Sequence, residues 1–273
     1  MKKKILLLLS LLFVLVGLTG CKSITKSANS EDTWNKISRK KEVVVGLDDS
    51  FVPMGFSKKN GQLAGYDIDL AREVFKRYGI KVSFQTIDWS MNATELRNGT
   101  IDLIWNGYSI TDQRKKKVAF SRPYLRNGQV LVVKKNSGIH DFAQMKDKTL
   151  GMQTGSTAEQ WYEGKQKALK AKSTVLYDQI PNSFLDLNAG RIQGILLDEV
   201  YANYYIAHMA KSSDYRVIEN RSVPADLFAV GMRKGDKTLR KKINASLLAL
   251  QKDGKLEQLN EKWFNRKSNY LGR

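Results

Sequence analysis

Short apolar segments alternate with longer amphipathic segments over most of the chain. Runs of about four to eight apolar residues bounded by glycine or polar residues are typical of buried strands, whereas apolar positions three or four apart are typical of helices. We predict strands at residues 42–47, 81–85, 101–105, 129–133, 148–152 and 192–197. We predict helices at residues 66–75, 92–98, 158–169 and 178–188, and two amphipathic helices between residues 239 and 263. This alternation is typical of an α/β fold.

One unit of this pattern occurs twice. Residues 95–104 align with residues 186–195 without a gap, and each segment reads as a helix end, a glycine and a strand. In this alignment Gly107, just beyond the first strand, corresponds to Asp198 at the end of the second. The repeat predicts two α/β lobes with a cleft between them. A helix-glycine-strand joint that simply recurs is the alternative explanation.

Two segments are predicted to cross between the lobes, at residues 129–133 and 228–232. Lobe 1 then comprises residues 42–128 and 225–273, and lobe 2 comprises residues 129–224. A pair of crossing strands is a hinge geometry, which allows two lobes to close on a ligand.

The N-terminus predicts export and a lipid anchor. Three lysines precede an apolar core at residues 5–16, which is shorter than the ~20 residues of a membrane-spanning helix and typical of a secretory signal. The sequence Leu-Thr-Gly-Cys that ends at Cys21 resembles a bacterial lipobox. We therefore predict a signal peptide at residues 1–20, lipid on Cys21 and a flexible tether at residues 21–41. An ordinary signal peptide with a chance cysteine is the alternative.

The net charge limits the possible partners of the chain, and the cysteine content limits its disulfides. The formal net charge is +19, or +16 without the three lysines of the signal, and the basic residues are scattered along the chain. Export argues against nucleic acid as a partner, so we interpret the charge as compatibility with an anionic membrane and cell wall. Because the chain has a single cysteine, no intramolecular disulfide is expected.

Polar residues at the strand ends can recognise an α-amino acid. A carboxylate is best bound by a guanidinium and N–H groups, and an ammonium by a carboxylate with carbonyl or hydroxyl oxygens. Arg114 and Thr157 are candidates for the first role. Asp198, Ser109 and the carbonyl of Gly107 are candidates for the second.

Other strand ends supply candidates for the ligand side chain. Phe51 and Trp89 can sandwich it, and Asp48 and Asn106 can reach its polar end. From the residues alone, Trp89 can equally be a core residue and Asp48 a turn cap.

The segment from Gln153 to Thr157 is a glycine-containing turn between a strand and a helix. Such turns bind anions through backbone N–H groups, so Gln153 and Ser156 join the candidate ligand-binding residues. An ordinary helix cap is the alternative for this segment. For Asp67 and Asp69, in the first turn of another helix, we prefer the capping role.

Five motifs in order carry a family resemblance. They are residues 65–71 (GYDIDLA), 109–114 (SITDQR), 153–157 (QTGST), 198–200 (DEV) and the tail 255–264, which ends in Lys-Trp-Phe. Over residues 42–265 the chain resembles the family 3 extracellular solute-binding proteins, the amino-acid-binding lipoproteins of ABC importers.

The resemblance implies a two-lobed type II periplasmic-binding fold, held by lipid on the outer face of a bacterial cell membrane. It implies an amino acid ligand, polar or basic from the match at Asp48 and Asn106, and permease subunits as partners. From their positions within the motifs, the candidate residues would bind the ligand carboxylate, ammonium and side chain in the same roles that their chemistry suggests. We expect a monomer without cofactor or metal. Tyr108 and Gln153 stand where other members vary, so the identity of the amino acid does not follow.

Two other functions compete with transport. A dehydratase-like enzyme on the same scaffold would use Glu199 as a proton donor, but neither histidine lies in a catalytic motif and no HExxH or GxSxG sequence occurs. An amino-acid sensor without transport is the third interpretation.

Overall fold

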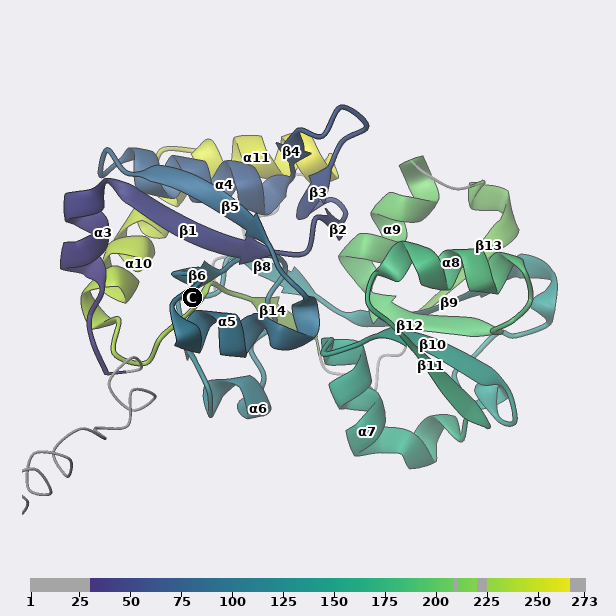
Figure 1. Cartoon of the computed structure of the whole chain (residues 1–273). Coiled ribbons are helices and arrows are strands. Elements are labelled where there is room, and N and C mark those ends of the chain that lie inside the picture. The colour runs from purple at the N-terminus through teal and green to yellow at the C-terminus, as the bar shows by residue number, and fades with distance from the viewer. Residues whose placement is uncertain (1–29, 209–210, 220–224, 266–273) are drawn as a thin grey trace, which may run out of the picture.

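The computed structural model describes residues 30–208, 211–219 and 225–265, in two lobes that lie side by side (Figure 1). The signal peptide, Cys21 and the rest of the predicted tether up to residue 29 lie outside the described residues. Within these three ranges no helix is both long and apolar enough to cross a lipid bilayer.

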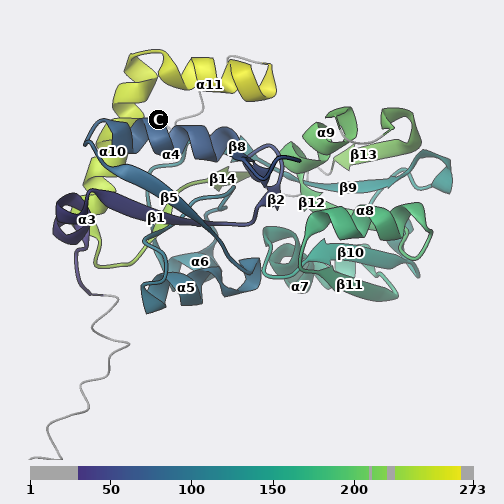
Figure 2. The same cartoon turned by 45° about the horizontal axis from the view of Figure 1, so that its top comes forward.

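Lobe 1 is built on a mixed five-stranded sheet. Its central strand β6 pairs in parallel with β1 and antiparallel with β15. The order is β5 (Lys81–Thr86), β1 (Glu42–Leu47), β6 (Leu103–Ile104), β15 (Gly231–Met232) and β7 (Ala119–Phe120). Its helices are α3 (Trp34–Lys40), α4 (Tyr66–Lys76), α5 (Asn92–Asn98), α6 (Asp112–Lys115), α10 (Lys237–Lys252) and α11 (Lys255–Phe264). Helices α10 and α11 pack on α4, which places the end of the described chain beside the first lobe (Figure 2).

Lobe 2 has a second five-stranded sheet. Strand β12 lies at its centre, parallel to β10 and antiparallel to β9. The order is β11 (Ser173–Tyr177), β10 (Thr149–Gln153), β12 (Gly194–Asp198), β9 (Gln129–Lys134) and β13 (Tyr215–Glu219). The helices of this lobe are α7 (Thr157–Leu169), α8 (Ile180–Asn188) and α9 (Glu199–His208). Short 3₁₀ turns occur at η1 (Trp89–Met91), η2 (Lys135–Ser137), η3 (Ala143–Met145) and η4 (Ser212–Asp214).

The lobes are joined by a two-stranded antiparallel ribbon of β8 (Leu125–Asn127) and β14 (Asp226–Phe228). Residue 127 pairs with residue 226 in this ribbon. The predicted crossing at residues 129–133 is wrong by a few residues, because that segment is β9 and already belongs to the sheet of lobe 2. The predicted return crossing at residues 228–232 also lies a few residues too far along the chain, because β15 already belongs to the sheet of lobe 1.

The predicted repeat is present in three dimensions. Helix α5 leads through Gly99 to β6, and α8 leads through Gly190 to β12. Both glycines have positive φ, 79° and 73°, which terminates the helix with little strain. Both strands lie at the centre of their sheets, so the polar residues that follow them meet between the lobes.

The predicted tether ends earlier than expected. Residues 34–40 form α3, whose Ile37 is buried in the main core and whose Trp34 packs edge-on against Tyr78 at 5.1 Å. The hydroxyl of Thr33 also donates to Asp236 at 2.6 Å. The sequence around α3 is mostly polar, so this helix was not predicted. Two apolar residues three positions apart, Trp34 and Ile37, are enough to pack one short helix on the sheet.

A small antiparallel sheet projects from lobe 1 toward lobe 2. It consists of β2 (Ser50–Phe51), β3 (Gly55–Ser57) and β4 (Leu63–Ala64). The ring of Phe51 lies 5.5 Å from that of Tyr201 on α9, so apolar contact continues from one lobe into the other. Both residues belong to one large core cluster.

Candidate functional site

A small cavity lies between the lobes, and we call it the interlobe cavity. Its volume is about 10 Å³, and its lining includes nine of the eleven predicted ligand-binding residues: Phe51, Trp89, Asn106, Gly107, Arg114, Gln153, Ser156, Thr157 and Asp198. The other two, Asp48 and Ser109, are bonded to residues of this lining. Since such a volume holds about one water, an amino acid enters only if the lobes move apart.

Arg114 connects the two lobes. It lies on α6, whose first turn is capped by the Thr111 hydroxyl, and only 5% of its surface is exposed. Its guanidinium donates to the Ser109 carbonyl at 3.0 Å in lobe 1, and to the Thr157 hydroxyl at 3.2 Å and the Gly155 carbonyl at 3.1 Å in lobe 2. The guanidinium also stacks on the Tyr108 ring at 4.3 Å. Burial lowers the pKa of Arg114 from its usual high value, a direction that marks how little water surrounds it.

The N-terminus of α7 supplies the facing wall. Ser156 accepts a hydrogen bond from the Glu159 N–H at 3.1 Å, and the Glu159 carboxylate accepts one from the Gly155 N–H at 2.6 Å. These reciprocal bonds resemble a capping box. The predicted helix cap is therefore present at Ser156, while Thr157 next to it contacts Arg114. The cap is thus confirmed, and anion binding at this turn stays a prediction.

Asp198 ends β12 with its carboxylate almost fully buried. One oxygen accepts from Asn127 Nδ2 at 2.5 Å and from Gln129 Nε2 at 2.8 Å. Burial, and after it the neighbouring charge of Asp226, raise the pKa of Asp198 to about 7. A cationic group placed here would restore the charged form.

Asp226 was missed by the sequence analysis. Its carboxylate accepts from the Ser109 hydroxyl at 2.7 Å, from Asn127 Nδ2 at 2.8 Å and from Gln129 Nε2 at 3.3 Å. No motif surrounds it in the sequence, and it reaches this position only because β14 pairs with β8.

Asp48 and Gln153 meet from opposite lobes. Gln153 Nε2 donates to Asp48 Oδ2 at 2.6 Å, while Asp48 Oδ1 accepts from the N–H and hydroxyl of Ser50. Asp48 is therefore both a turn cap and part of this cluster. Burial raises the pKa of Asp48 from its ordinary value. The side-chain oxygen of Asn106 accepts a hydrogen bond from the Asp48 N–H, and its Nδ2 is buried without a hydrogen-bond partner among the described residues.

The two predicted aromatic residues both line the cavity. Trp89 is 7% exposed and lies edge-on to Tyr108 at 5.8 Å, so it is also a core residue. Phe51 crowds Gly107, where an added Cβ would lie 2.7 Å from its ring. Gly107 has φ 56°, so both space and backbone conformation require glycine there.

Asp67 is not the helix cap that we expected. It makes no side-chain cap to α4 and is buried, with Oδ2 accepting from the Gly107 N–H at 2.7 Å and the Tyr124 hydroxyl at 2.9 Å. Burial raises its pKa to about 7. Its position fixes the Gly107 backbone. Asp69 instead accepts from Lys262 and from the Trp263 ring N–H, at 2.7 and 2.9 Å, and ties α11 to α4.

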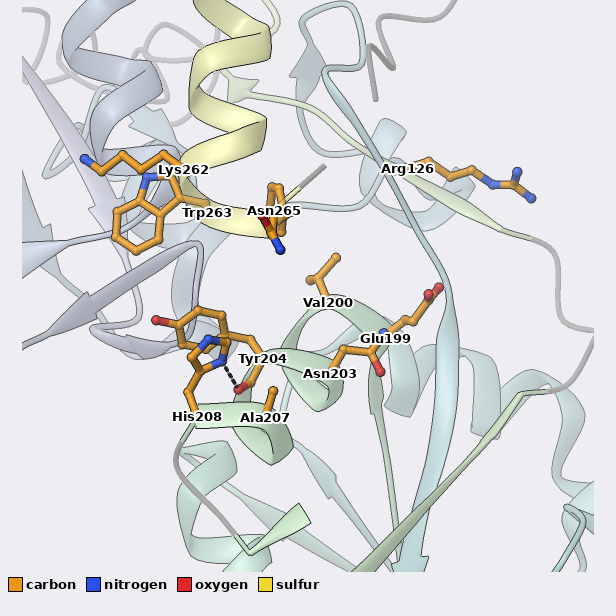
Figure 3. A pocket seen from close by; sticks show the side chains of 11 residues that line it. Arg126, Glu199, Val200, Asn203, Tyr204, Ala207, His208, Lys262, Trp263 and Asn265 are labelled. Atoms are coloured by element: carbon orange, nitrogen blue, oxygen red, sulfur yellow. Dashed lines mark hydrogen bonds between the residues drawn. The ribbon is translucent and has the colours of Figure 1, made fainter. Parts of the chain in front are cut away.

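A larger cavity lies on the other face of the joining ribbon, and we call it the rear groove. It measures about 440 Å³ and lies between α9 and the end of α11 (Figure 3). Arg126 lines it, and because neighbours on a strand point to opposite faces, Asn127 points to the side of the interlobe cavity, where it donates to Asp198. Its other lining residues are Glu199, Val200, Asn203, Tyr204, Ala207, His208, Lys262, Trp263, Phe264 and Asn265.

Residues 43–266 match the model of the bacterial extracellular solute-binding proteins, family 3. The chain belongs to this family. This is a family of solute-binding proteins, not of enzymes, so the dehydratase-like alternative is not supported. Among described residues we find no group of three or more His, Cys, Asp or Glu side chains that could hold a metal ion.

Members of the family with known ligands are similar over nearly the whole chain. The L-cystine-binding protein TcyJ of Escherichia coli (strain K12) is 32% identical, covering 88% of each chain. The arginine-binding extracellular protein ArtP of Bacillus subtilis (strain 168) is 29% identical, covering 96% of this chain and 98% of its own. A substrate-binding protein of an ABC uptake transporter from Streptococcus pneumoniae, solved with bound histidine, is 46% identical with a TM-score of 0.84, covering 88% of this chain and 98% of its own.

Proposed function

We propose that this protein captures one amino acid with a polar or basic side chain in the interlobe cavity and delivers it to the permease subunits of an ABC importer. The observation that carries the proposal is the buried guanidinium of Arg114, which is shared between the lobes and lines the same cavity as Asp198. Opposite charges at one small site match the two charges of an amino acid.

In this proposal the ligand carboxylate takes over the bonds that Arg114 now makes to Thr157 and Gly155. The first N–H groups of α7 and the hydroxyl of Thr157 complete that subsite. Asp198, the Ser109 hydroxyl and the Gly107 carbonyl bind the ammonium. The lobes are residues 42–128 with 225–273, and residues 129–224, and they open about the ribbon of β8 and β14.

The side chain of the ligand then points to the far end of the cavity. Phe51 and Trp89 enclose it, and Asp48, Gln153 and Asn106 meet its polar end. An unpaired amide N–H at Asn106 and a carboxylate at Asp48 favour a ligand with both donors and an acceptor. The histidine and cystine bound by relatives fit that description. The side chain of the arginine bound by another relative has donors alone, so it would match Asp48 but not the Asn106 N–H.

The test is a thermal-shift screen of the purified protein against the twenty amino acids and cystine. A ligand at a hundred times its Kd adds about 2.7 kcal/mol of stability, and for a chain of this size each kcal/mol raises the Tm by about 2–4 °C. We expect polar or basic amino acids to raise the Tm most. If none of them raises it while a sugar or a dicarboxylate does, the proposed ligand class is wrong.

We also propose that lipid on Cys21 holds the protein on the outer face of the membrane, close to its permease. Support comes from the lipobox-like sequence and the family of exported proteins. A permease and an ATPase encoded next to this chain would support transport over the sensor alternative. We expect the protein to act as a monomer without a cofactor.

A further inference from the structure

Two carboxylates share their hydrogen-bond donors beside the interlobe cavity. Asn127 donates to Asp198 at 2.5 Å and to Asp226 at 2.8 Å, and Gln129 donates to the same two residues at 2.8 and 3.3 Å. The Asn127 amide is held in this orientation because its oxygen accepts the Val200 N–H at 3.3 Å. Asp198 is 7% exposed, and Asn127 and Gln129 are more buried still. The pair is thus a built feature of the fold and not a chance surface contact.

The pair also spans the hinge. Asp226 lies on β14 and Asn127 on β8, which are the two strands of the joining ribbon. Asp198 ends the central strand of lobe 2, and Ser109 belongs to lobe 1. Each carboxylate is therefore bound by groups whose relative position depends on the angle between the lobes.

We propose that Asp226 is a positioning residue of the amino-acid site, which acts through Ser109 and Asp198 and makes capture of the ligand ammonium release a proton. The proposal rests on the proposed function, because it requires an ammonium at Asp198. A hydroxyl has one hydrogen, and Ser109 donates it to Asp226, so its lone pairs are left to accept from the ammonium. Asp226 thereby fixes the Ser109 hydroxyl as a hydrogen-bond acceptor toward the ligand.

The proton is held by Asp198. This carboxylate is buried, and Asp226 places a second negative charge beside it, so the ionised form of Asp198 is disfavoured and its pKa is raised to about 7. When the ligand ammonium arrives, its positive charge stabilises the ionised form of Asp198. The ligand keeps its own proton, the proton of Asp198 passes to the buffer, and the charge balances.

Other charged groups face the pair, and their pH dependence must be distinguished from that of Asp198 and Asp226. Arg114 lies near both carboxylates and stays protonated at all relevant pH values. Glu199 and Arg126 line the rear groove, on the other face of the ribbon. Asp48 and Asp67 are buried near the cavity and have raised pKa values, so either can add its own pH dependence. A variant at Asp226 alone distinguishes these sources.

The experiment is calorimetry with the amino acid that raises the Tm most, at pH 6 and pH 8.5, in two buffers of different ionisation enthalpy. For the wild type we expect release of up to about one proton at pH 6 and none at pH 8.5, with affinity falling by up to about ten-fold per pH unit below 7. Asp226→Asn keeps the shape of the side chain and removes its charge. It should reduce proton release at pH 6 and move the fall in affinity to lower pH, because one of the two causes that raise the pKa of Asp198 is removed. It should also weaken binding at pH 8.5 by roughly ten-fold because a nearby negative charge is lost.

Asp214→Asn, in an exposed turn of lobe 2, is the matched control and should behave as wild type. Binding by wild type without proton release at pH 6 would overturn the inference and leave the proposed function standing. An Asp226→Asn profile that follows wild type would also overturn it, and would assign the proton to the burial of Asp198 alone or to Asp48 or Asp67. If no amino acid produces heat at either pH, the proposed function itself fails.

Discussion

Replacing Arg114 with alanine tests the carboxylate subsite directly. The guanidinium is 5% exposed and makes one hydrogen bond within lobe 1 and two to lobe 2. In the variant a ligand carboxylate would be buried without its cationic partner, which costs about 2–5 kcal/mol. Affinity should therefore fall by roughly thirty-fold to several thousand-fold. Arg114→Lys should restore part of the loss, because an ammonium cannot reproduce two parallel N–H bonds and the stacking on Tyr108.

Calorimetry on both variants, with circular dichroism to establish that each is folded, measures the effect. Lys115→Ala is the matched control, because Lys115 lies next to Arg114 on the same short helix but is exposed and forms a surface ion pair with Asp112. We expect its affinity to stay within about two-fold of wild type, since surface ion pairs contribute little. If Arg114→Ala binds the amino acid as tightly as Lys115→Ala does, the carboxylate lies elsewhere and the subsite is wrong.

Three further predictions concern other parts of the chain. Arg233→Met should lower the free energy of unfolding in urea by about 3–5 kcal/mol, because Arg233 is 3% exposed and pairs with the buried Asp236; unchanged stability would show that the ion pair contributes nothing. Asp48→Asn should lower the affinity for a ligand with a cationic side chain by about ten-fold or more, and the affinity for a neutral polar ligand much less, as measured by calorimetry. An equal loss of affinity for both ligands would show that Asp48 does not determine selectivity. Cys21→Ser should block lipidation and processing before residue 21, as followed by mass spectrometry of the membrane fraction, whereas wild-type protein found unlipidated in the medium would refute the anchor.

Local patterns predicted most of the elements. The strands at residues 42–47 and 129–133 and the helix at residues 92–98 agree with β1, β9 and α5 within one residue, because apolar spacing and a helix-ending glycine are properties of neighbouring residues. The edge strands β11 and β13 were not predicted. No residue of β11 and only Ile218 of β13 is buried, so the apolar pattern of both strands is weaker.

The site was predicted where a motif marks it and missed where long-range pairing makes it. Arg114 and Thr157 stand in recognisable turns, and the structure places them 3.2 Å apart. Asp226 depends on the register of β14 against β8, residues about a hundred positions apart, and no local signal reports that register. Asp67 looked like a helix cap because its position fits one. The structure shows that it instead accepts hydrogen bonds from the Gly107 N–H and the Tyr124 hydroxyl in the interior of the lobe.

The rear groove provides a way to watch the lobes move without touching the ligand. It is lined by α9 of lobe 2 and by the end of α11 of lobe 1 (Figure 3), so a rotation of one lobe against the other changes its width. Ala207 lines it on α9, and the natural chain has no cysteine beyond Cys21. A protein that starts at residue 30 with Ala207→Cys would carry one thiol, and an environment-sensitive fluorophore attached there would turn each capture event into an optical signal.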